Sequence, residues 1–406
     1  MKNHRGSSVT MLLVTERAVG TIRERKGDPT MGLFGKALSL LVVISLAGAF
    51  LACSVEDDIP GLDAPDDRTD ARETDATPET DVPPPVLGEP EWRTEPLDPE
   101  KTTDLEWRGI SGAILDDGYL VGAVGRSGRA IIYSSLTGDW RWRAAPVEET
   151  LHGIWLESLD NVVVVGEEAT ILRWDPSLDE RGGWLNEHLS MVRPVTLTDI
   201  WGTRESGQFV CGHDSVLARY DTQTKRWDVH FHPGAELLPD LSPPTRIFRA
   251  LHGSGPNDVF AVGNRIIGHY DGREWRFSEV DTVLHGVWVA GPNKNVYAVG
   301  DEGYIFVLER SSGASEWVQE QPFRIALYDV WGLDPDRVYA VGVQSNVLNN
   351  MSGDWDWTQP QAKPGLPPEM MVPQNLTLRG VWGTSPTDLF LISSRHHLIR
   401  YTRFPR

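Results

Sequence analysis

Seven side chains that could bind an anion recur at one position of a repeated sequence pattern. The pattern is L-x-G-[VI]-W, and its second position holds Arg108, His152, Thr198, Arg249, His285, Tyr328 and Arg379. Arginine can donate two parallel hydrogen bonds to a carboxylate or phosphate, and His, Tyr and Thr are also donors. If the fold brings these positions together, we expect an anion-binding ring. The alternative is that they pair with neighbouring carboxylates or fill a channel with water.

Two of these residues make the predicted ring sensitive to pH. His152 and His285 have side chains whose ordinary pKa lies near 6.5. We therefore expect anion binding to strengthen below about pH 6.5, as the two imidazoles become charged.

The seven positions belong to a longer cassette, L-x-G-[VI]-W-G-x-x-P-x-D-V-[YF]-A-V-G. Clear copies read LHGVWVAGPNKNVYAVG (284–300), LYDVWGLDPDRVYAVG (327–342) and LRGVWGTSPTDLFLIS (378–393). Successive copies lie 36 to 51 residues apart, which is typical of one β-propeller blade. Each unit holds four short β-type runs, and runs such as NVYAVG are apolar throughout, which indicates strands covered on both faces.

The repeat predicts an all-β fold, a seven-bladed β-propeller with four antiparallel strands per blade. The last unit ends after its third strand, and a Trp-bearing strand at 90–97 precedes the first unit. We expect that N-terminal strand to complete the last blade and close the ring. Of the 16 Trp, all but Trp107 and Trp174 fall in first or fourth strands. We expect them to pack between blades rather than to form a stacking platform for sugars or bases.

The N-terminal region resembles a bacterial lipoprotein signal peptide. Residues 31–53 contain a start Met, one Lys, an apolar stretch and small residues before Cys53, although Phe50 stands where Leu is usual. The resemblance implies that Cys53 is lipidated and begins the mature chain, and Ser54 after it favours the outer membrane. A plain membrane anchor is the alternative. We expect translation to start at Met31, with Met1 left open.

Three regions follow along the chain. Residues 1–52 are the expected signal-peptide region. Residues 53–88 are the lipidated Cys and a disordered acidic Pro/Thr tether, with 11 Asp/Glu against two Lys/Arg. Residues 89–406 are the propeller. The whole chain has a net charge of −20, which argues against nucleic acid as a partner. Cys211 is expected to be a buried free thiol rather than a metal ligand.

No catalytic signature can be assigned. The chain contains no G-x-S-x-G, P-loop, HExxH or paired CxxC motif, and its many turn carboxylates form no diagnostic pair. Catalytic residues therefore stay unknown, and we expect no cofactor and no metal site. Two long Pro-rich segments, 233–247 and 358–376, could serve recognition or could be ordered spacers.

Over about 90–406 the cassette resembles the repeat of seven-bladed β-propeller lipoproteins of bacterial envelopes, distantly akin to BNR and kelch-type propellers. The resemblance implies a monomeric, membrane-anchored lipoprotein of the cell envelope, on the periplasmic side or exposed at the surface. Its non-catalytic propeller would bind a protein or an anionic glycan. The alternative is a glycoside hydrolase or lyase that acts on polysaccharide, with its site on the face that carries the loops.

Overall fold

The computed structural model describes residues 23–24, 87–102, 104–178, 182–189, 191, 193–231, 247–320, 322–351, 354–361 and 364–404. Two compact units divide the chain, and the second, Lys26–Pro85, lies outside the described residues. Except for residues 23–24 and 87–88, the predicted signal-peptide region, the predicted lipidation site Cys53 and the predicted tether lie outside them too, as does the Pro-rich segment 233–247 apart from residue 247. In the part of the chain that is described, no helix is long and apolar enough to cross a membrane.

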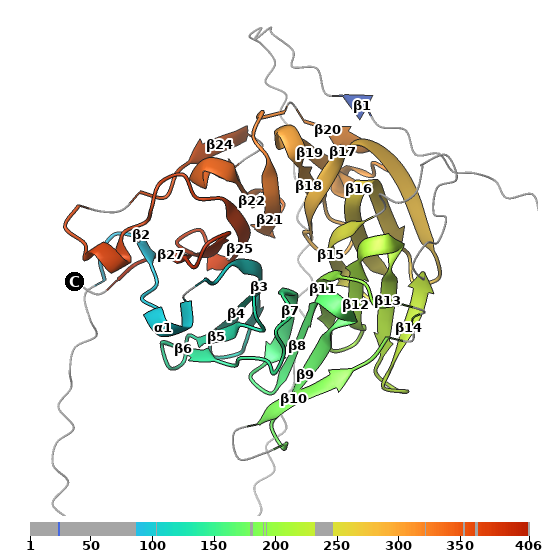
Figure 1. Ribbon diagram of the computed structural model, residues 1–406. Coiled ribbons are helices and arrows are strands. Elements are labelled where there is room, and N and C mark those ends of the chain that lie inside the picture. Colours follow the sequence, from blue (N-terminus) through green and yellow to red (C-terminus); the bar gives the residue numbers. More distant parts are fainter. Residues whose placement is uncertain are drawn as a thin grey trace, which may run out of the picture. The chain divides into compact units, whose positions relative to one another are not determined.

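Residues 87–404 form a β-propeller whose sheets surround a central channel (Figure 1). Five sheets have four strands each. The first contains β3 (Trp107–Ile114), β4 (Tyr119–Gly125), β5 (Ala130–Ser134) and β6 (Asp139–Trp142). The second contains β7 (Leu151–Ser158), β8 (Asn161–Gly166), β9 (Ile171–Asp175) and β10 (Gly183–Glu187). The third contains β11 (Leu197–Thr203), β12 (Gly207–Gly212), β13 (Leu217–Asp221) and β14 (Arg226–Phe231).

The other two four-stranded sheets lie toward the C-terminus. One contains β21 (Leu327–Asp334), β22 (Arg337–Gly342), β23 (Val347–Met351) and β24 (Asp354–Thr358). The other contains β25 (Leu378–Ser385), β26 (Asp388–Ser393), β27 (Leu398–Thr402) and β2 (Glu91–Thr94). Short helical turns connect the strands: α1 (Pro99–Thr102), η1 (Glu167–Ala169), η2 (His213–Ser215), η3 (Asp301–Gly303), η4 (Arg310–Ser312), η5 (Val343–Ser345) and η6 (Pro368–Met370).

The sixth sheet is larger, and it corrects the predicted count of blades. It contains β15 (Phe248–Gly255), β16 (Asp258–Tyr270), β17 (Trp275–Val289), β18 (Val296–Gly300), β19 (Ile305–Leu308), β20 (Trp317–Gln319) and the two-residue β1 (Arg23–Glu24), which pairs in parallel with β20. The described strands thus form six sheets, so the prediction of seven separate four-stranded blades is wrong.

The reason for the merged sheet lies in β17. Its first part pairs with β16 as far as Val283, and its second part pairs with β18 from Leu284 onward. The two cassettes on either side are only 36 residues apart, the shortest spacing in the chain. That length leaves no room for a loop between an outer strand and the next inner strand, so the chain stays extended and the hydrogen-bonded ladder continues.

The predicted N-terminal strand is present at the seam between the two ends of the propeller. β2 pairs antiparallel with β27, and the rings of Trp92 and Tyr401 lie 4.6 Å apart. Glu95, which directly follows β2, accepts a hydrogen bond of 3.0 Å from the indole of Trp140 in the first sheet. Across the same seam, Arg400 of β27 donates to the hydroxyl of Tyr119 at 2.7 Å. The two ends of the chain thus hold the first and last sheets together.

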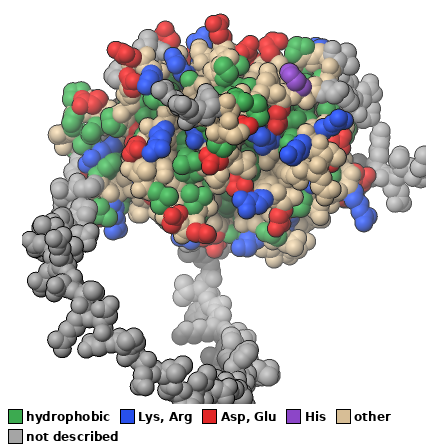
Figure 2. Space-filling view, turned by 90° about the horizontal axis from the view of Figure 1, so that it is seen from below, with side chains coloured by type: hydrophobic (Ala, Val, Ile, Leu, Met, Phe, Trp, Pro, Cys, Tyr) green, Lys and Arg blue, Asp and Glu red, His purple; other side chains and the backbone are tan. Residues whose placement is uncertain are grey.

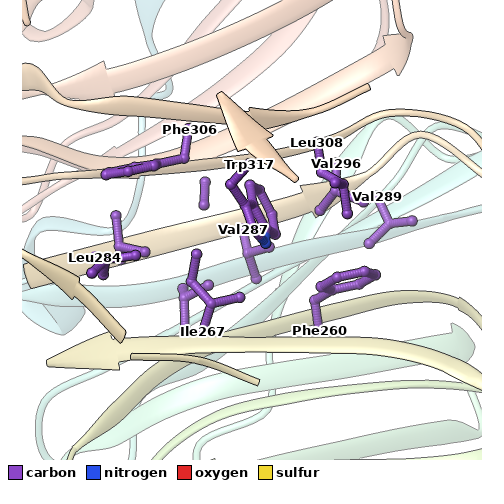
Figure 3. Close-up of a cluster of buried hydrophobic side chains, with 12 residues drawn as sticks. Phe260, Ile267, Leu284, Val287, Val289, Val296, Phe306, Leu308 and Trp317 are labelled. Atoms are coloured by element: carbon purple, nitrogen blue, oxygen red, sulfur yellow. The ribbon is translucent and has the colours of Figure 1, made fainter. Parts of the chain in front are cut away.

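Apolar side chains fill the spaces between sheets. In the cluster of Figure 3, Phe260, Leu284, Phe306 and Trp317 pack together with neighbouring Val and Ile side chains from β16 to β20. Six further clusters of the same kind occur among the described residues. The core is therefore distributed around the propeller, which agrees with strands that are apolar on both faces.

Closer to the channel, a Trp of one inner strand packs against a Gly of the next. A Cβ atom added to Gly253 would lie 2.8 Å from Cη2 of Trp201, and one added to Gly332 would lie 2.7 Å from Cη2 of Trp288. The Trp155 indole donates at 2.7 Å to the carbonyl of Gly202. These contacts explain the Gly of W-G at Gly253 and Gly332: Trp201 and Trp288 each need a residue without a side chain on the neighbouring strand. They also support the prediction that these Trp pack between repeats.

Candidate functional site: the arginine ring of the central channel

The seven residues predicted to form a ring all line one cavity, of about 390 Å³, at the centre of the propeller. Each lies near the start of an inner strand: β3, β7, β11, β15, the second part of β17, β21 or β25. The structure therefore brings together positions that are spread over more than 270 residues of sequence. We call these seven side chains the arginine ring.

A β-bulge occurs at every one of the seven positions. In β7, for example, Leu151 pairs with Gly166 and Gly153 pairs with Val165, so His152 has no partner in the ladder. The same shift surrounds each other member of the ring. A bulge bends the strand locally and changes the direction of the extra side chain. The bulge thus accounts for seven side chains of different types that all line the channel.

The glycine of the A-V-G motif lies beside this bulge. A Cβ atom added to Gly300 would collide with the carbonyl oxygen of Val283, directly before the bulged strand start. Five other cassettes show the same close approach, at Gly125, Gly166, Gly212, Gly263 and Gly342. The motif glycine is therefore required where two backbones come close together, next to six of the seven ring residues; the last cassette, beside Arg379, has Ser393 there.

Part of the ring is satisfied by neighbouring polar groups. Arg108 donates to Glu106 at 2.6 Å, and His285 lies 2.8 Å from Asp301. Arg249 donates from Nε to the side-chain oxygen of Asn264 at 3.0 Å. The alternative of pairing with neighbouring acids is therefore met for Arg108 and His285, and His152 also has an acid nearby, with its Nε2 3.9 Å from Oε1 of Glu167. It is not met in full, as the remaining nitrogen atoms show.

Three buried nitrogen atoms of the ring make no hydrogen bond. They are Nε of Arg379, Nε of Arg108 and Nε2 of His152. Their strands, β25, β3 and β7, are neighbours around the channel in that order. The guanidinium of Arg379 lies over the ring of Tyr328, 4.2 Å from its centroid. A buried donor without a partner costs roughly 1 to 3 kcal/mol, so the two arginine Nε–H groups favour a ligand that accepts hydrogen bonds.

The three arginines are close enough to repel one another. Burial lowers the pKa of Arg379, and the positive charges of Arg108 and Arg249 lower it further against the opposing effect of Tyr328 and Glu106. Burial likewise lowers the pKa of Arg249. An anion in the ring would relieve this repulsion.

The two histidines titrate at lower pH than the sequence predicted. Burial, and then the charge of Arg108, lower the pKa of His152 to about 4. Burial lowers the pKa of His285 as well, against the opposing effect of its hydrogen bond to Asp301, and the charges of Arg249 and Arg379 contribute smaller decreases. The expectation that His152 becomes charged near pH 6.5 is therefore wrong, because burial disfavours its charged form and the neighbouring Arg108 adds to this effect.

Two carboxyl groups in the channel were missed by sequence reasoning. Asp199 and Asp329 line the same cavity and stand where five other cassettes have Gly or Ala. Each accepts hydrogen bonds from two backbone N–H groups, and burial raises the pKa of each to about 7. The sequence does show this difference, because LTDIW and LYDVW have Asp at the cassette position that is usually Gly.

The outer surface of the propeller carries charges of both signs. Figure 2 shows Lys and Arg mixed with Asp and Glu over the side seen there, without a large area of one charge.

Cys211 is buried, as predicted, with its Sγ 3.4 Å from the hydroxyl of Thr198. Within the described ranges, no three His, Cys, Asp or Glu side chains are grouped so that they could hold a metal ion.

Comparison with known proteins supports the fold. No protein-family model matches the chain, and no curated protein matches it. A structure of YCF48 bound to a D1 peptide is 15% identical, with a TM-score of 0.57, over 78% of this chain and 99% of that one. YCF48 from Cyanidioschyzon merolae is 12% identical, with a TM-score of 0.58, over 77% of this chain and 99% of that one. At such identities the likeness is one of fold, and with 1232 matching chains that fold does not identify a function. The chain is a β-propeller similar in fold to YCF48.

Proposed function

We propose that this protein is a non-catalytic binding propeller whose arginine ring holds a carboxylate group of a protein partner. The observation that carries the proposal is the pair of unsatisfied Nε–H donors on Arg108 and Arg379, with the Nε2 atom of His152 also lacking a hydrogen bond. A carboxylate has two oxygen atoms and about four acceptor positions, so one group can satisfy several of these donors. Arg249 donates to the amide oxygen of Asn264 rather than to a carboxylate, so it adds another positive charge to the ring.

A peptide is the favoured ligand because the similar propeller of YCF48 has been solved with a D1 peptide bound. The acceptor would be an Asp or Glu side chain or a C-terminal carboxylate that enters the channel. A cavity of about 390 Å³ has room for such a side chain and for ordered water around it. An anionic glycan has the same carboxylate chemistry, and the test below distinguishes the two sources.

The test measures binding of three probes to the full chain by isothermal titration calorimetry. The probes are a Glu-rich decapeptide, the matching Gln-rich decapeptide and a trigalacturonic acid. We expect the Glu-rich peptide to bind, the Gln-rich peptide not to bind, and Arg108→Gln with Arg379→Gln to weaken binding at least tenfold. Each arginine–carboxylate contact contributes roughly 1.5 to 3 kcal/mol, so tenfold is a low estimate.

Arg276→Gln is the matched control, because Arg276 is an exposed arginine that pairs with Asp271 and Glu274 away from the channel. The control should bind the Glu-rich peptide as the wild type does. Equal binding of both decapeptides, or binding that survives the double ring substitution, contradicts the proposal. Binding of the galacturonate alone points to a glycan instead of a protein.

We further propose that the propeller is held at the cell envelope, in the outer membrane, through a lipid on Cys53. The signal-peptide pattern before Cys53 supports this, and Met31 is the proposed start. The mature chain would then lack the two residues of β1. The acidic segment 54–88 would then be the tether. In cells grown with radiolabelled palmitate, we expect label in the wild type and in Cys211→Ser but none in Cys53→Ser. Since the chain has two Cys, Cys211→Ser is the exact control for loss of a thiol.

A further inference from the structure

Arg126 and Arg395 stand at corresponding places on the side of the propeller where the inner strands begin. Each lies in the hairpin between the second and third strands of its sheet, after β4 or after β26. The first hairpin joins the start of its inner strand, because the N–H of Arg126 donates to the carbonyl of Glu106 at 3.1 Å. In the last sheet, the N–H of Ser394 donates to the carbonyl of Thr377 at 2.8 Å. Both arginines therefore lie on the side that carries the arginine ring.

These two hairpins belong to neighbouring sheets, although they are far apart in sequence. The inner strand β3 packs beside β25 and β26. The indole of Trp107, at the start of β3, donates at 3.1 Å to the carbonyl of His396, in the hairpin of Arg395. Arg108 directly follows Trp107, and Arg379 lies near the start of β25. The name seam arginines is used below for Arg108, Arg126, Arg379 and Arg395.

Among the described residues, one carboxylate contacts the seam arginines. Oε2 of Glu106 accepts a hydrogen bond of 2.6 Å from Arg108, and its Oε1 lies 3.7 Å from Nη1 of Arg126. The guanidinium groups of Arg379 and Arg395 make no hydrogen bond or ion pair with any described residue. Two of the four seam arginines therefore have donors available for an anionic ligand, and the other two share one acid.

Two other arginines on this side of the propeller are paired with acids of their own. Arg193 donates to Asp214, in the corresponding hairpin of the third sheet, at 2.5 Å. Arg265 lies 3.1 Å from Glu279. Their side chains are 61% and 52% exposed, close to the 55% of Arg126. An exposed arginine here can thus have its own acid partner, and the seam arginines differ in sharing one.

We propose that the seam arginines hold a second acidic side chain of the peptide whose first carboxylate enters the arginine ring. The inference rests on the proposed function of the ring, and it names the sequence that the partner would carry: two acidic residues close together. Arg108 and Arg379 line the channel, and Arg126 and Arg395 are not among its lining residues. One extended segment can therefore place one acid in the channel and the next acid outside it.

The second acid should contribute less to affinity than the first. Ion pairs at exposed arginines are weakened by water and salt, whereas the ring is partly buried. Their main effect is on which partner is selected, because a second complementary charge favours one ligand over another.

The test is isothermal titration calorimetry of the full chain with Gln decapeptides that have blocked termini. One peptide carries a single central Glu, and the others carry a second Glu two or three positions before or after it. The measured quantity is the ratio of the dissociation constant of the single-Glu peptide to that of the best two-Glu peptide. We expect a ratio of about five at low salt, above the value of about two that a choice between two equivalent acids gives. In about 0.5 M sodium chloride the ratio should fall toward two, because salt screens exposed charges.

The double variant Arg126→Gln with Arg395→Gln should lower the ratio at low salt to about two. The matched control is Arg193→Gln with Arg265→Gln, since these arginines are similarly exposed and already have acid partners. The control should keep the ratio of the wild type.

A ratio of about two in the wild type overturns the inference, and so does an equal loss in the test and control variants or no loss in the test variant. In each of these outcomes the single-Glu peptide still binds, so the proposed function of the ring stands. If neither kind of peptide binds, the proposed function fails, and this inference fails with it.

Discussion

Asp199 and Asp329 make the same pair of hydrogen bonds 130 residues apart. Each carboxylate accepts one backbone N–H from the residue that follows it, Ile200 or Val330, at 2.8 Å. Each accepts a second from the next inner strand, at Leu251 at 2.8 Å or Val381 at 2.9 Å. These two acids therefore connect β11 to β15 and β21 to β25, and neither has a cationic partner among its hydrogen bonds.

This arrangement predicts a stability that falls as pH rises. Burial raises the pKa of each carboxyl to about 7, above its unfolded value near 3.8. The contribution to stability is thus complete below pH 3.8 and is lost as pH rises through about 7. The loss is at most about 1.4 kcal/mol per pH unit for each acid. We expect the double variant Asp199→Asn with Asp329→Asn to show a smaller decrease in free energy of unfolding between pH 5 and 8 than the wild type.

The measured quantity is the change in the free energy of unfolding with pH, not its value at one pH. An Asn keeps one acceptor and so loses one of the two backbone hydrogen bonds at every pH. Urea unfolding at pH 5, 6, 7 and 8 measures the slope. Asp281→Asn is the control, because the side chain of Asp281 is fully exposed. Parallel pH curves for the wild type and the double variant would refute the assignment.

A second prediction concerns two glycines of one strand. An added Cβ at Gly253 would lie 2.8 Å from the Trp201 ring and 2.6 Å from the carbonyl oxygen of Asp258, whereas one at Gly255 would meet nothing within 4 Å. Gly253→Ala should destabilise the protein by about 1 to 3 kcal/mol because the indole must move. Gly255→Ala should change stability by less than about 0.5 kcal/mol. Similar melting temperatures for the two variants would argue against the Trp-on-Gly packing.

The sequence predicted the ring because a repeat places equivalent residues at equivalent places. Arg108, Arg249 and Arg379 could be aligned without a structure, and their convergence followed from the propeller. The bulge at each of them could not be predicted, since a bulge exists only relative to a paired strand. The shortest spacing, 36 residues, was visible too, yet whether hydrogen bonds continue through β17 depends on chain geometry.

A third prediction concerns closure of the propeller. Trp92 of β2 packs on Tyr401 of β27, and the pairing of these strands joins the two ends of the chain. Trp92→Ala should destabilise the protein, toward the lower end of the roughly 3 to 5 kcal/mol typical of buried aromatic truncations, because Trp92 is only partly buried. Trp357→Ala is the control, since it removes an exposed indole and should cost little. Thermal unfolding of the two variants measures the difference, and equal melting temperatures would mean that the seam contributes no such stability.

The last prediction is the pH dependence of anion binding in the ring. His152 is neutral at pH 7 because burial and Arg108 lower its pKa to about 4. A bound anion favours the charged imidazole, so affinity should rise as pH falls through the region of pH 5 to 4 and should be nearly constant between pH 6 and 8.

Sulfate is the suitable probe because it keeps its charge over this range. One additional charge-assisted hydrogen bond predicts an increase of about tenfold. Another charged group also faces His152, since Oε1 of Glu167 lies 3.9 Å from its Nε2. His152→Asn separates these effects: calorimetric titration should show that it removes most of the increase below pH 5 while leaving affinity at pH 7 within about twofold. An increase near pH 6.5, or one that persists in His152→Asn, would show that His152 is not the group that titrates.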